Sequence, residues 1–273
     1  MKHTDLHFRL PGNFLLFFGF IFSVSHAQEI TPPQCYGGPR LTREFVQEEM
    51  IYPAKALESK TEGTVVLSFI VKSDGSVSYV KVDQRVSPEL DREAIRILGK
   101  ILWHPATKLG VPIDYRHQFE VKFRIRKYMN MIRSRGPEYF VNPYEPVDST
   151  NVVYRRKDLD EPPKPLFSIL DKDFQTFLTN NLVYPDAAFK QNISGTVELR
   201  FVVETNGRVS NIETLQSVGG GCTEEAIRVL KLIKWFPGIK DKKAVRTTMP
   251  LEITFDIARR SVAGSIPSPG QLH

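Results

Sequence analysis

The chain has 273 residues, of which 41% are hydrophobic and 25% charged, as expected for a globular protein of about two domains. The formal net charge is +6, but no basic motif interleaved with aromatic residues is present, so we expect no nucleic-acid partner. The basic stretches Lys122–Arg135 and Arg155–Lys157 are interpreted as solvated surface and linker, with adhesion to an acidic envelope surface as the alternative.

The N-terminus resembles a secretory signal. Lys2 and Arg9 precede the apolar run Phe14–Val24, and the small-x-small pattern Ser25–Ala27 follows. We therefore expect residues 1–27 to be a cleavable signal peptide, with an exported chain that starts near Gln28. The alternative is a retained membrane anchor, although the run is shorter than the roughly 20 residues that a membrane span needs.

A long repeat organises the rest of the chain. At a constant offset of 132 residues, Tyr52-Pro53 recurs as Tyr184-Pro185 and Asp74-Gly75 as Asn206-Gly207. Roughly a third of the positions are identical over the two copies, a period too long for a solenoid, whose units run about 20–50 residues. We therefore expect a duplicated domain with one core in each copy.

The first half of copy one predicts two short helices and a hairpin. A helix begins near Thr42, and Ala54–Ser59 forms a second helix after a proline. Thr64–Lys72 alternates apolar and polar residues as a strand does, and a turn at Asp74-Gly75 leads into the return strand Val77–Val82. The phase of this return strand changes at the same place in both copies, which predicts a β-bulge.

The second half predicts a helix and a last strand. Ser87 and Pro88 begin the helix, whose buried stripe consists of Leu90, Ala94, Ile97, Leu98 and Ile101. The strand His117–Ile125 turns Phe119, Val121 and Phe123 inward. The fold class is therefore α+β, with two small three-stranded antiparallel sheets, each packed against helices. The edge of such an open sheet can accept a partner strand.

The predicted domains are residues 35–127 and 158–258, joined by a linker over residues 128–157 and followed by a disordered tail over residues 259–273. Cys35 and Cys222 occupy different copies at positions that are not equivalent, so a disulfide between them stays an open alternative.

The residue pattern indicates a protein that is not an enzyme and has no cofactor or metal. His104 and His117 have no counterparts in copy two, where Phe236 and Met249 stand. No nucleophile, phosphate-loop or metal-ligand motif occurs. The acidic groups Asp91–Glu93 and Glu224-Glu225 fit helix N-termini better than a catalytic pair.

In order, these motifs resemble the C-terminal domain of TonB. The pattern is Tyr-Pro, Gly-x-Val-x-x-x-Phe-x-Val, Asp-Gly-x-Val, an Ala-containing helix, Trp-x-Pro and a terminal strand. Copy one carries it from Tyr52-Pro53 to Phe119–Ile125, and copy two from Tyr184-Pro185 to Leu251–Ile257. Both copies together cover about 200 residues of the chain.

The resemblance implies a periplasmic module of TonB-dependent transport that captures the TonB-box peptide of an outer-membrane receptor, or a segment of another periplasmic protein. The peptide would be added as a strand beside Gln118–Ile125 or Pro250–Ile257. The candidate docking residues on these two edges are Gln118, Glu120, Lys122, Arg124, Pro250, Glu252, Thr254 and Asp256.

Two other functions stay open. One is a true energy transducer, anchored in the inner membrane by its N-terminal segment and facing the periplasm. The other is an envelope scaffold that forms a homodimer through its sheet edges.

Overall fold

The computed structural model describes residues 30–135, 142–168, 170–257 and 261–267. The expected signal peptide, residues 1–27, lies outside these ranges. None of the helices in the described part is long and apolar enough to cross a membrane.

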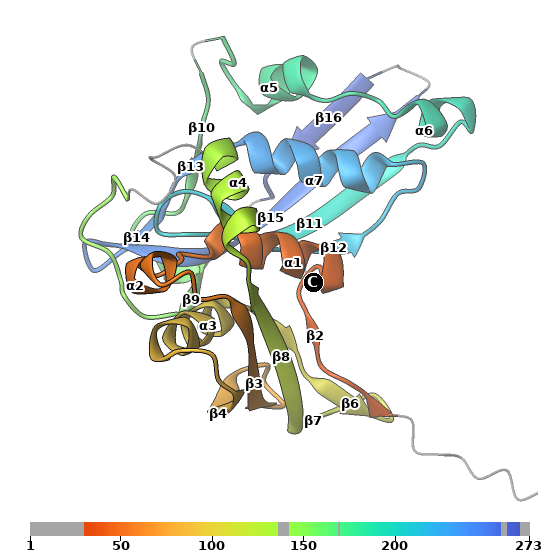
Figure 1. Ribbon diagram of the computed structural model, residues 1–273. Helices are drawn as coiled ribbons and strands as arrows, with labels where there is room; N and C mark the ends of the chain where they lie inside the picture. Colours follow the sequence, from red (N-terminus) through yellow and green to blue (C-terminus); the bar gives the residue numbers. More distant parts are fainter. Residues whose placement is uncertain (1–29, 136–141, 169, 258–260, 268–273) are drawn as a thin grey trace, which may run out of the picture.

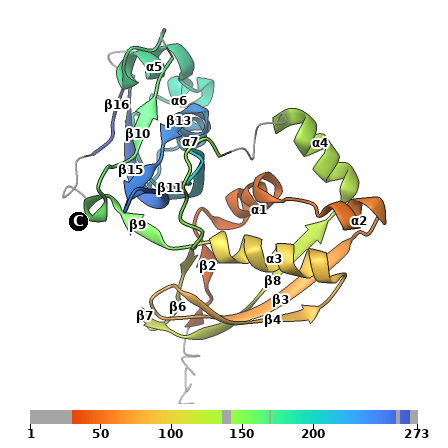
Figure 2. The same cartoon turned by 90° about the vertical axis from the view of Figure 1, so that its left-hand side faces the viewer.

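The first copy is a three-stranded antiparallel sheet in the order β4-β3-β8, with helices against one face (Figures 1 and 2). Its main elements are α1 (Gly38–Glu49), α2 (Ala54–Glu58), β3 (Gly63–Val71), β4 (Val77–Gln84), α3 (Pro88–Lys100), β8 (Tyr115–Phe123) and α4 (Ile125–Arg135). Short strands complete it: β1 (Ile30–Thr31), β2 (Gln34–Cys35), β5 (Trp103–His104), β6 (Ala106–Lys108) and β7 (Val111–Ile113). The predicted α+β class and three-stranded sheet are confirmed.

The core of this copy lies between the sheet and α3. All members of the predicted helix stripe are buried, together with Val65, Leu67, Phe69, Val121 and Phe123 from the strands. The hydroxyl of Ser87 accepts a hydrogen bond from the Leu90 N–H at 3.3 Å and so caps α3. The helix therefore begins where the sequence predicts.

The second copy repeats this sheet and extends it. Its main elements are α5 (Phe174–Asn181), α6 (Asp186–Lys190), β11 (Gly195–Val203), β12 (Val209–Gln216), α7 (Cys222–Leu232), β14 (Gly238–Lys240), β15 (Lys243–Asp256) and β16 (Ser261–Ser265). Before and between them lie β9 (Val153–Arg155), η1 (Arg156–Asp158), β10 (Lys164–Leu166) and β13 (Lys234–Phe236). Strands β9, β14 and β16 all pair with β15, so this sheet has six strands.

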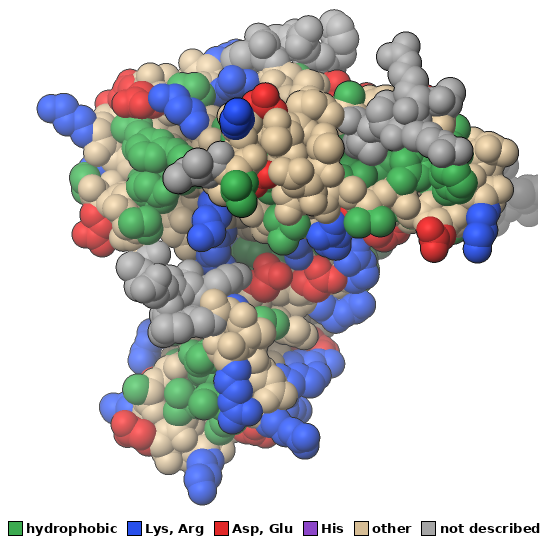
Figure 3. All heavy atoms as spheres, turned by 90° about the horizontal axis from the view of Figure 1, so that it is seen from above, with side chains coloured by type: hydrophobic (Ala, Val, Ile, Leu, Met, Phe, Trp, Pro, Cys, Tyr) green, Lys and Arg blue, Asp and Glu red, His purple; other side chains and the backbone are tan. Residues whose placement is uncertain are grey.

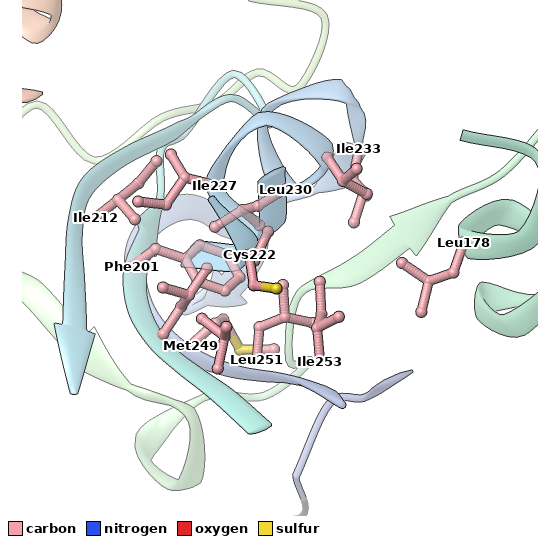
Figure 4. Close-up of a cluster of buried hydrophobic side chains, with 14 of the residues drawn as sticks. Leu178, Phe201, Ile212, Cys222, Ile227, Leu230, Ile233, Met249, Leu251 and Ile253 are labelled. Carbon is pink, nitrogen blue, oxygen red and sulfur yellow. The ribbon is translucent and has the colours of Figure 1, made fainter. Parts of the chain in front are cut away.

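The core of the second copy is equally well filled. Figure 4 shows Cys222 of α7 directed into the same cluster as Leu251 and Ile253 of β15. Cys35 packs against the other core, and both thiols are free, so the open alternative of a disulfide is not realised here.

The predicted hairpin bulge is present in both copies. The register shifts between Ser68 and Ile70 in one copy and between Arg200 and Val202 in the other. The residues on the opposite strand, Tyr79 and Asn211, take positive φ angles of 53° and 47°.

Two predictions about the segments after each sheet were wrong. Residues up to Arg135, assigned to the linker, form helix α4 because Tyr128 and Ile132 pack on the first core. Residues 261–265, assigned to a disordered tail, form β16 because β15 offers an edge with which they can pair. Residues 259, 260 and 268–273 of that tail lie outside the described residues.

The two copies pack against each other, with α1 between them (Figure 2). Leu41 of α1 is buried in the core of the second copy. The amide of Asn211 bridges to copy one: its oxygen accepts from the Leu102 N–H at 2.8 Å, and its nitrogen donates to the Lys100 carbonyl at 3.0 Å. Copy two is thereby fixed to the C-terminal end of α3.

Candidate functional site

The outer edge of β8 carries the first set of predicted docking residues. Within the described residues, β3 is the strand that pairs with β8, over nine consecutive positions without a register shift. The side chains of Gln118, Glu120 and Lys122 are exposed. This edge has no bulge in its pairing with β3, and its outer backbone groups lie beside no other described strand, so it offers a regular template for a further strand.

Arg124 follows β8 directly, in the connection to α4. Its guanidinium donates to the Phe123 carbonyl at 3.0 Å, and the Glu62 carboxylate accepts from the Ile125 N–H at 2.6 Å. Glu62 therefore satisfies a free backbone donor at the start of α4, where a negative charge is favourable.

The second set of docking residues lies on β15, whose equivalent edge is filled. Strand β16 pairs antiparallel with β15, matching Glu252 with Ser265, Thr254 with Ala263 and Asp256 with Ser261 (Figure 1). Pro250 lies just beyond this pairing, and Arg246 to Thr248 pair with β9. The structure thus brings three of the four residues together with a segment of the same chain.

Strand β16 is held by close packing. A Cβ atom at Gly264 would lie 2.5 Å from a Leu178 methyl carbon and 2.7 Å from the Phe174 ring, so only glycine fits against α5. Ile266 packs against the second core, and the Arg156 guanidinium donates to the Pro267 carbonyl at 2.8 Å. These contacts favour the paired position of β16.

Beside the β8 edge lies a groove of about 540 Å³, which we call the β8 groove. It is bounded by α1, β8 and α4. Its floor consists of Val46, Met50, Phe119, Tyr128 and Met131. Its rim carries Arg43, Lys122, Arg124, Arg126 and Lys127, with Glu62 and Glu120 as the acidic groups.

Sequence reasoning missed this groove because it treated α4 as linker. A helical signal was present: Tyr128, Met131 and Ile132 follow an i, i+3, i+4 pattern, which places them on one face of a helix. The high density of arginine in Lys122–Arg135 concealed that pattern.

Charge is distributed unevenly over the molecule. Figure 3 shows a surface with two lobes, on which lysine and arginine side chains gather over much of the lower lobe. Acidic side chains are scattered over both lobes, and some of them lie between the lobes.

Glu49, at the end of α1, pairs with three cationic side chains. It lies 2.7 Å from Arg96, 2.6 Å from Lys100 and 3.3 Å from Arg208 of the second copy. Burial alone would raise the pKa of Glu49, but Lys100, Arg96 and Arg208 hold it below its ordinary value. Glu49 is therefore an ionised anchor between the copies.

The two histidines within the described residues, His104 and His117, both contact neighbouring side chains. His104 Nε2 lies 2.8 Å from a Glu213 carboxylate oxygen of the second copy, and its ring stacks on Tyr36 with 4.3 Å between centroids. His117 packs edge-on against Trp103, and burial lowers its pKa. In the part of the chain that is described, no group of His, Cys, Asp and Glu is suited to hold a metal ion.

Comparison with known proteins identifies the module. The family model described as "Gram-negative bacterial TonB protein C-terminal" matches residues 48–125 and 180–257, which is more than half of the chain. A solved structure, the NMR solution structure of the Helicobacter pylori TonB C-terminal domain (residues 179–285), is 19% identical. The match covers 30% of this chain and 76% of that one, with a TM-score of 0.23. No curated protein matches. The chain thus contains two tandem copies of the TonB C-terminal domain and belongs to that family.

Proposed function

We propose that this protein binds an extended peptide of an envelope partner by strand addition at the β8 edge of its first copy. The family serves transport across the Gram-negative envelope, and its C-terminal domains interact with outer-membrane receptors. The proposed peptide is therefore a segment of such a receptor. Its backbone would form a fourth strand beside β8, with the backbone supplying affinity and the side chains specificity.

The observation that carries the proposal is the difference between equivalent edges. β15 is paired with β16 along the positions equivalent to those of β8, whereas β3 alone of the described strands pairs with β8. The pairing of β16 with β15 in the second copy supports the idea that this edge of the module accepts a strand. The second copy then acts as a scaffold whose own edge is filled.

The opposite edge of the first sheet is a poorer template. Strand β4 pairs with β3 through two register shifts, and Tyr79 at the bulge has a positive φ. Bulges twist an edge strand and disfavour pairing with further chains. We therefore assign the binding site to β8 rather than β4.

The proposal also includes export by cleavage of the N-terminal signal and a role without catalysis. N-terminal sequencing of the protein isolated from its host tests the export step. A start near Gln28 is the expected result. A retained N-terminus would favour the anchored energy transducer instead.

The central experiment is a titration of isotope-labelled protein with peptides from the outer-membrane receptors of its host, following the backbone amides. We expect shifts over Tyr115–Phe123 and little change over Lys243–Asp256. The absence of amide shifts along β8 at millimolar peptide would overturn strand addition. A doubled mass in light scattering without peptide would favour the dimeric scaffold.

A further inference from the structure

The β8 groove of the first copy lies at the place that is equivalent to the position of β16 in the second copy. Helix α5 corresponds to α1 at the offset of 132 residues, so Phe174 and Leu178, which contact Gly264 of β16, correspond to Thr42 and Val46. Thr42 and Val46 both line the β8 groove. A strand added to β8 would therefore occupy in copy one the place that β16 occupies in copy two.

The two places differ in size. Phe174 and Leu178 are large, and they leave room only for a glycine on β16. Thr42 and Val46 are smaller, and the groove that they line measures about 540 Å³. Pockets of this size accommodate bulky ligand groups.

The floor of the groove is apolar and adaptable. Phe119 is the inward residue of β8 at the groove, Met50 approaches from the residue just after α1, and Met131 approaches from α4. Methionine fills irregular spaces around varied partners, and aromatic rings provide large contact areas. Because side chains alternate along a strand, every second residue of an added strand would point to this floor.

The rim differs from copy two in charge. Arg43, Lys122 and Arg124 are replaced by Gln175, Thr254 and Asp256 at the equivalent positions. Arg126 and Lys127 add two exposed cations from α4. Of the acidic groups, Glu62 accepts the Ile125 N–H and Glu120 lies 3.4 Å from Lys122, so the rim is positive overall.

From this size and charge we infer that the β8 groove selects an extended protein segment with bulky apolar residues at alternate positions and acidic residues at its flanks. This inference rests on the proposed strand addition and deepens it. The apolar side chains would enter the floor between α1 and α4. The acidic flanks would face the cations of the rim, of which Arg43, Lys122 and Arg124 have no cationic counterpart at the equivalent positions of copy two.

The probes are synthetic peptides of equal length. One has the core Leu-Thr-Phe-Thr-Leu with Glu-Glu at each end. A second keeps the core but has Lys-Lys at each end, and a third keeps the acidic ends around Ala-Thr-Ala-Thr-Ala. We expect the first peptide to bind at least about tenfold more tightly than either of the others, and this advantage over the lysine peptide to shrink with added salt.

Matched variants connect the effect to the groove. Arg43→Glu and Lys127→Glu change exposed rim residues outside β8 and should weaken the first peptide, whereas Lys190→Glu, an equal charge change on α6, should not. Val46→Trp fills the floor and should remove the advantage of the Leu-Phe core while leaving the alanine peptide unchanged. If Val46→Trp does not fold, the rim variants and the three peptides still test the selectivity of the β8 groove.

The outcomes separate this inference from the proposed function. Equal binding of the acidic and lysine peptides, with shifts along β8, would leave strand addition standing and overturn the charge selectivity. Shifts confined to α1 and α4 would overturn strand addition and support an acidic ligand of the groove. Displacement of the probes by a second copy of the chain, seen as a doubled mass, would overturn both.

Discussion

Arg246 and Glu204 form a buried, two-pronged ion pair, in which Nε and Nη2 each lie 3.0 Å from a carboxylate oxygen. The same guanidinium donates to the Lys100 carbonyl of the first copy at 2.8 Å and to the Asn151 carbonyl at 2.9 Å. At the equivalent positions copy one carries Asp114 and Lys72, an exposed pair of opposite polarity at 2.9 Å. The same two positions therefore hold a surface pair in copy one and an interface element in copy two.

Replacing Arg246 by alanine should therefore destabilise the protein strongly. Removing one partner of a buried pair leaves an uncompensated charge and typically costs about 3–5 kcal/mol. Urea unfolding measures the loss. Lys72→Ala is the matched control and should have a much smaller effect, because its pair is in water. Similar losses for both variants would contradict the interface role of Arg246.

Exchanging the two charges of each pair should affect the stability of the buried pair and of the exposed pair differently. The double variant Glu204→Arg/Arg246→Glu retains an ion pair but turns a carboxylate toward the carbonyls of Lys100 and Asn151. Thermal unfolding should therefore show that the stability lost in Arg246→Ala is not restored. The double variant Lys72→Asp/Asp114→Lys loses only an exposed contact, in which the Ser73 N–H donates to the Asp114 carboxylate at 2.9 Å, and should be tolerated much better. A stable first variant would argue against the carbonyl contacts.

Opening the second edge should create a second peptide site. Gly264→Val would place a side chain against Leu178 and Phe174 and expel β16 from β15. Receptor peptides should then shift the amides of Glu252–Asp256, the positions that β16 leaves, as well as those of β8. Ala263→Val changes an exposed position on the same strand and should leave β15 closed. Unchanged spectra for Gly264→Val would contradict steric control of β16.

Acidification should weaken the contact between the copies through Glu49. The pKa of Glu49 is lower in the folded than in the unfolded chain, so its stabilisation is complete above the ordinary carboxyl pKa of about 4. It is lost as the pH falls through the lower folded value. Urea midpoints should therefore fall more steeply below about pH 4 in the parent protein than in Glu49→Gln. Parallel pH profiles would refute this contribution.

The turn glycine Gly75 should be sensitive for steric reasons. It has φ +83°, and a Cβ there would lie 2.6 Å from the Trp103 carbonyl oxygen. Gly110 has a similar φ of +79° but open space around it, so Gly110→Ala should cost only the backbone strain, about 1–2 kcal/mol. Gly75→Ala should cost clearly more in thermal unfolding. Equal losses of stability in the two variants would mean that the Trp103 carbonyl can move away from the added Cβ at no energetic cost.

Local pattern was enough to predict the repeated module. The Asp74-Gly75 turn, the bulge and the stripe from Leu90 to Ile101 depend on neighbours a few residues away, which the sequence displays directly. The three central strands of each sheet, β4-β3-β8 and β12-β11-β15, followed from these elements, whereas the prediction of only three strands in the second sheet was wrong because β9, β14 and β16 also pair with β15.

Segments that depend on distant partners could not be predicted in this way. Strand β16 contains small residues and glycine, a composition typical of loops, and becomes a strand only because β15 and α5 leave a matching space. Asn211 is unremarkable as a bulge residue within β12, yet its amide joins the two copies. The β8 groove likewise exists only once α1 and α4 have docked.

The filled edge of β15 changes what duplication can achieve. Two linked open sites would gain avidity from a high effective concentration and could bridge two partners. With β16 in place, the chain is monovalent at these edges: it holds one proposed ligand at a time, and that ligand leaves at the rate set by a single contact. Duplication has then produced a larger body around one site, and the C-terminal segment determines the valency.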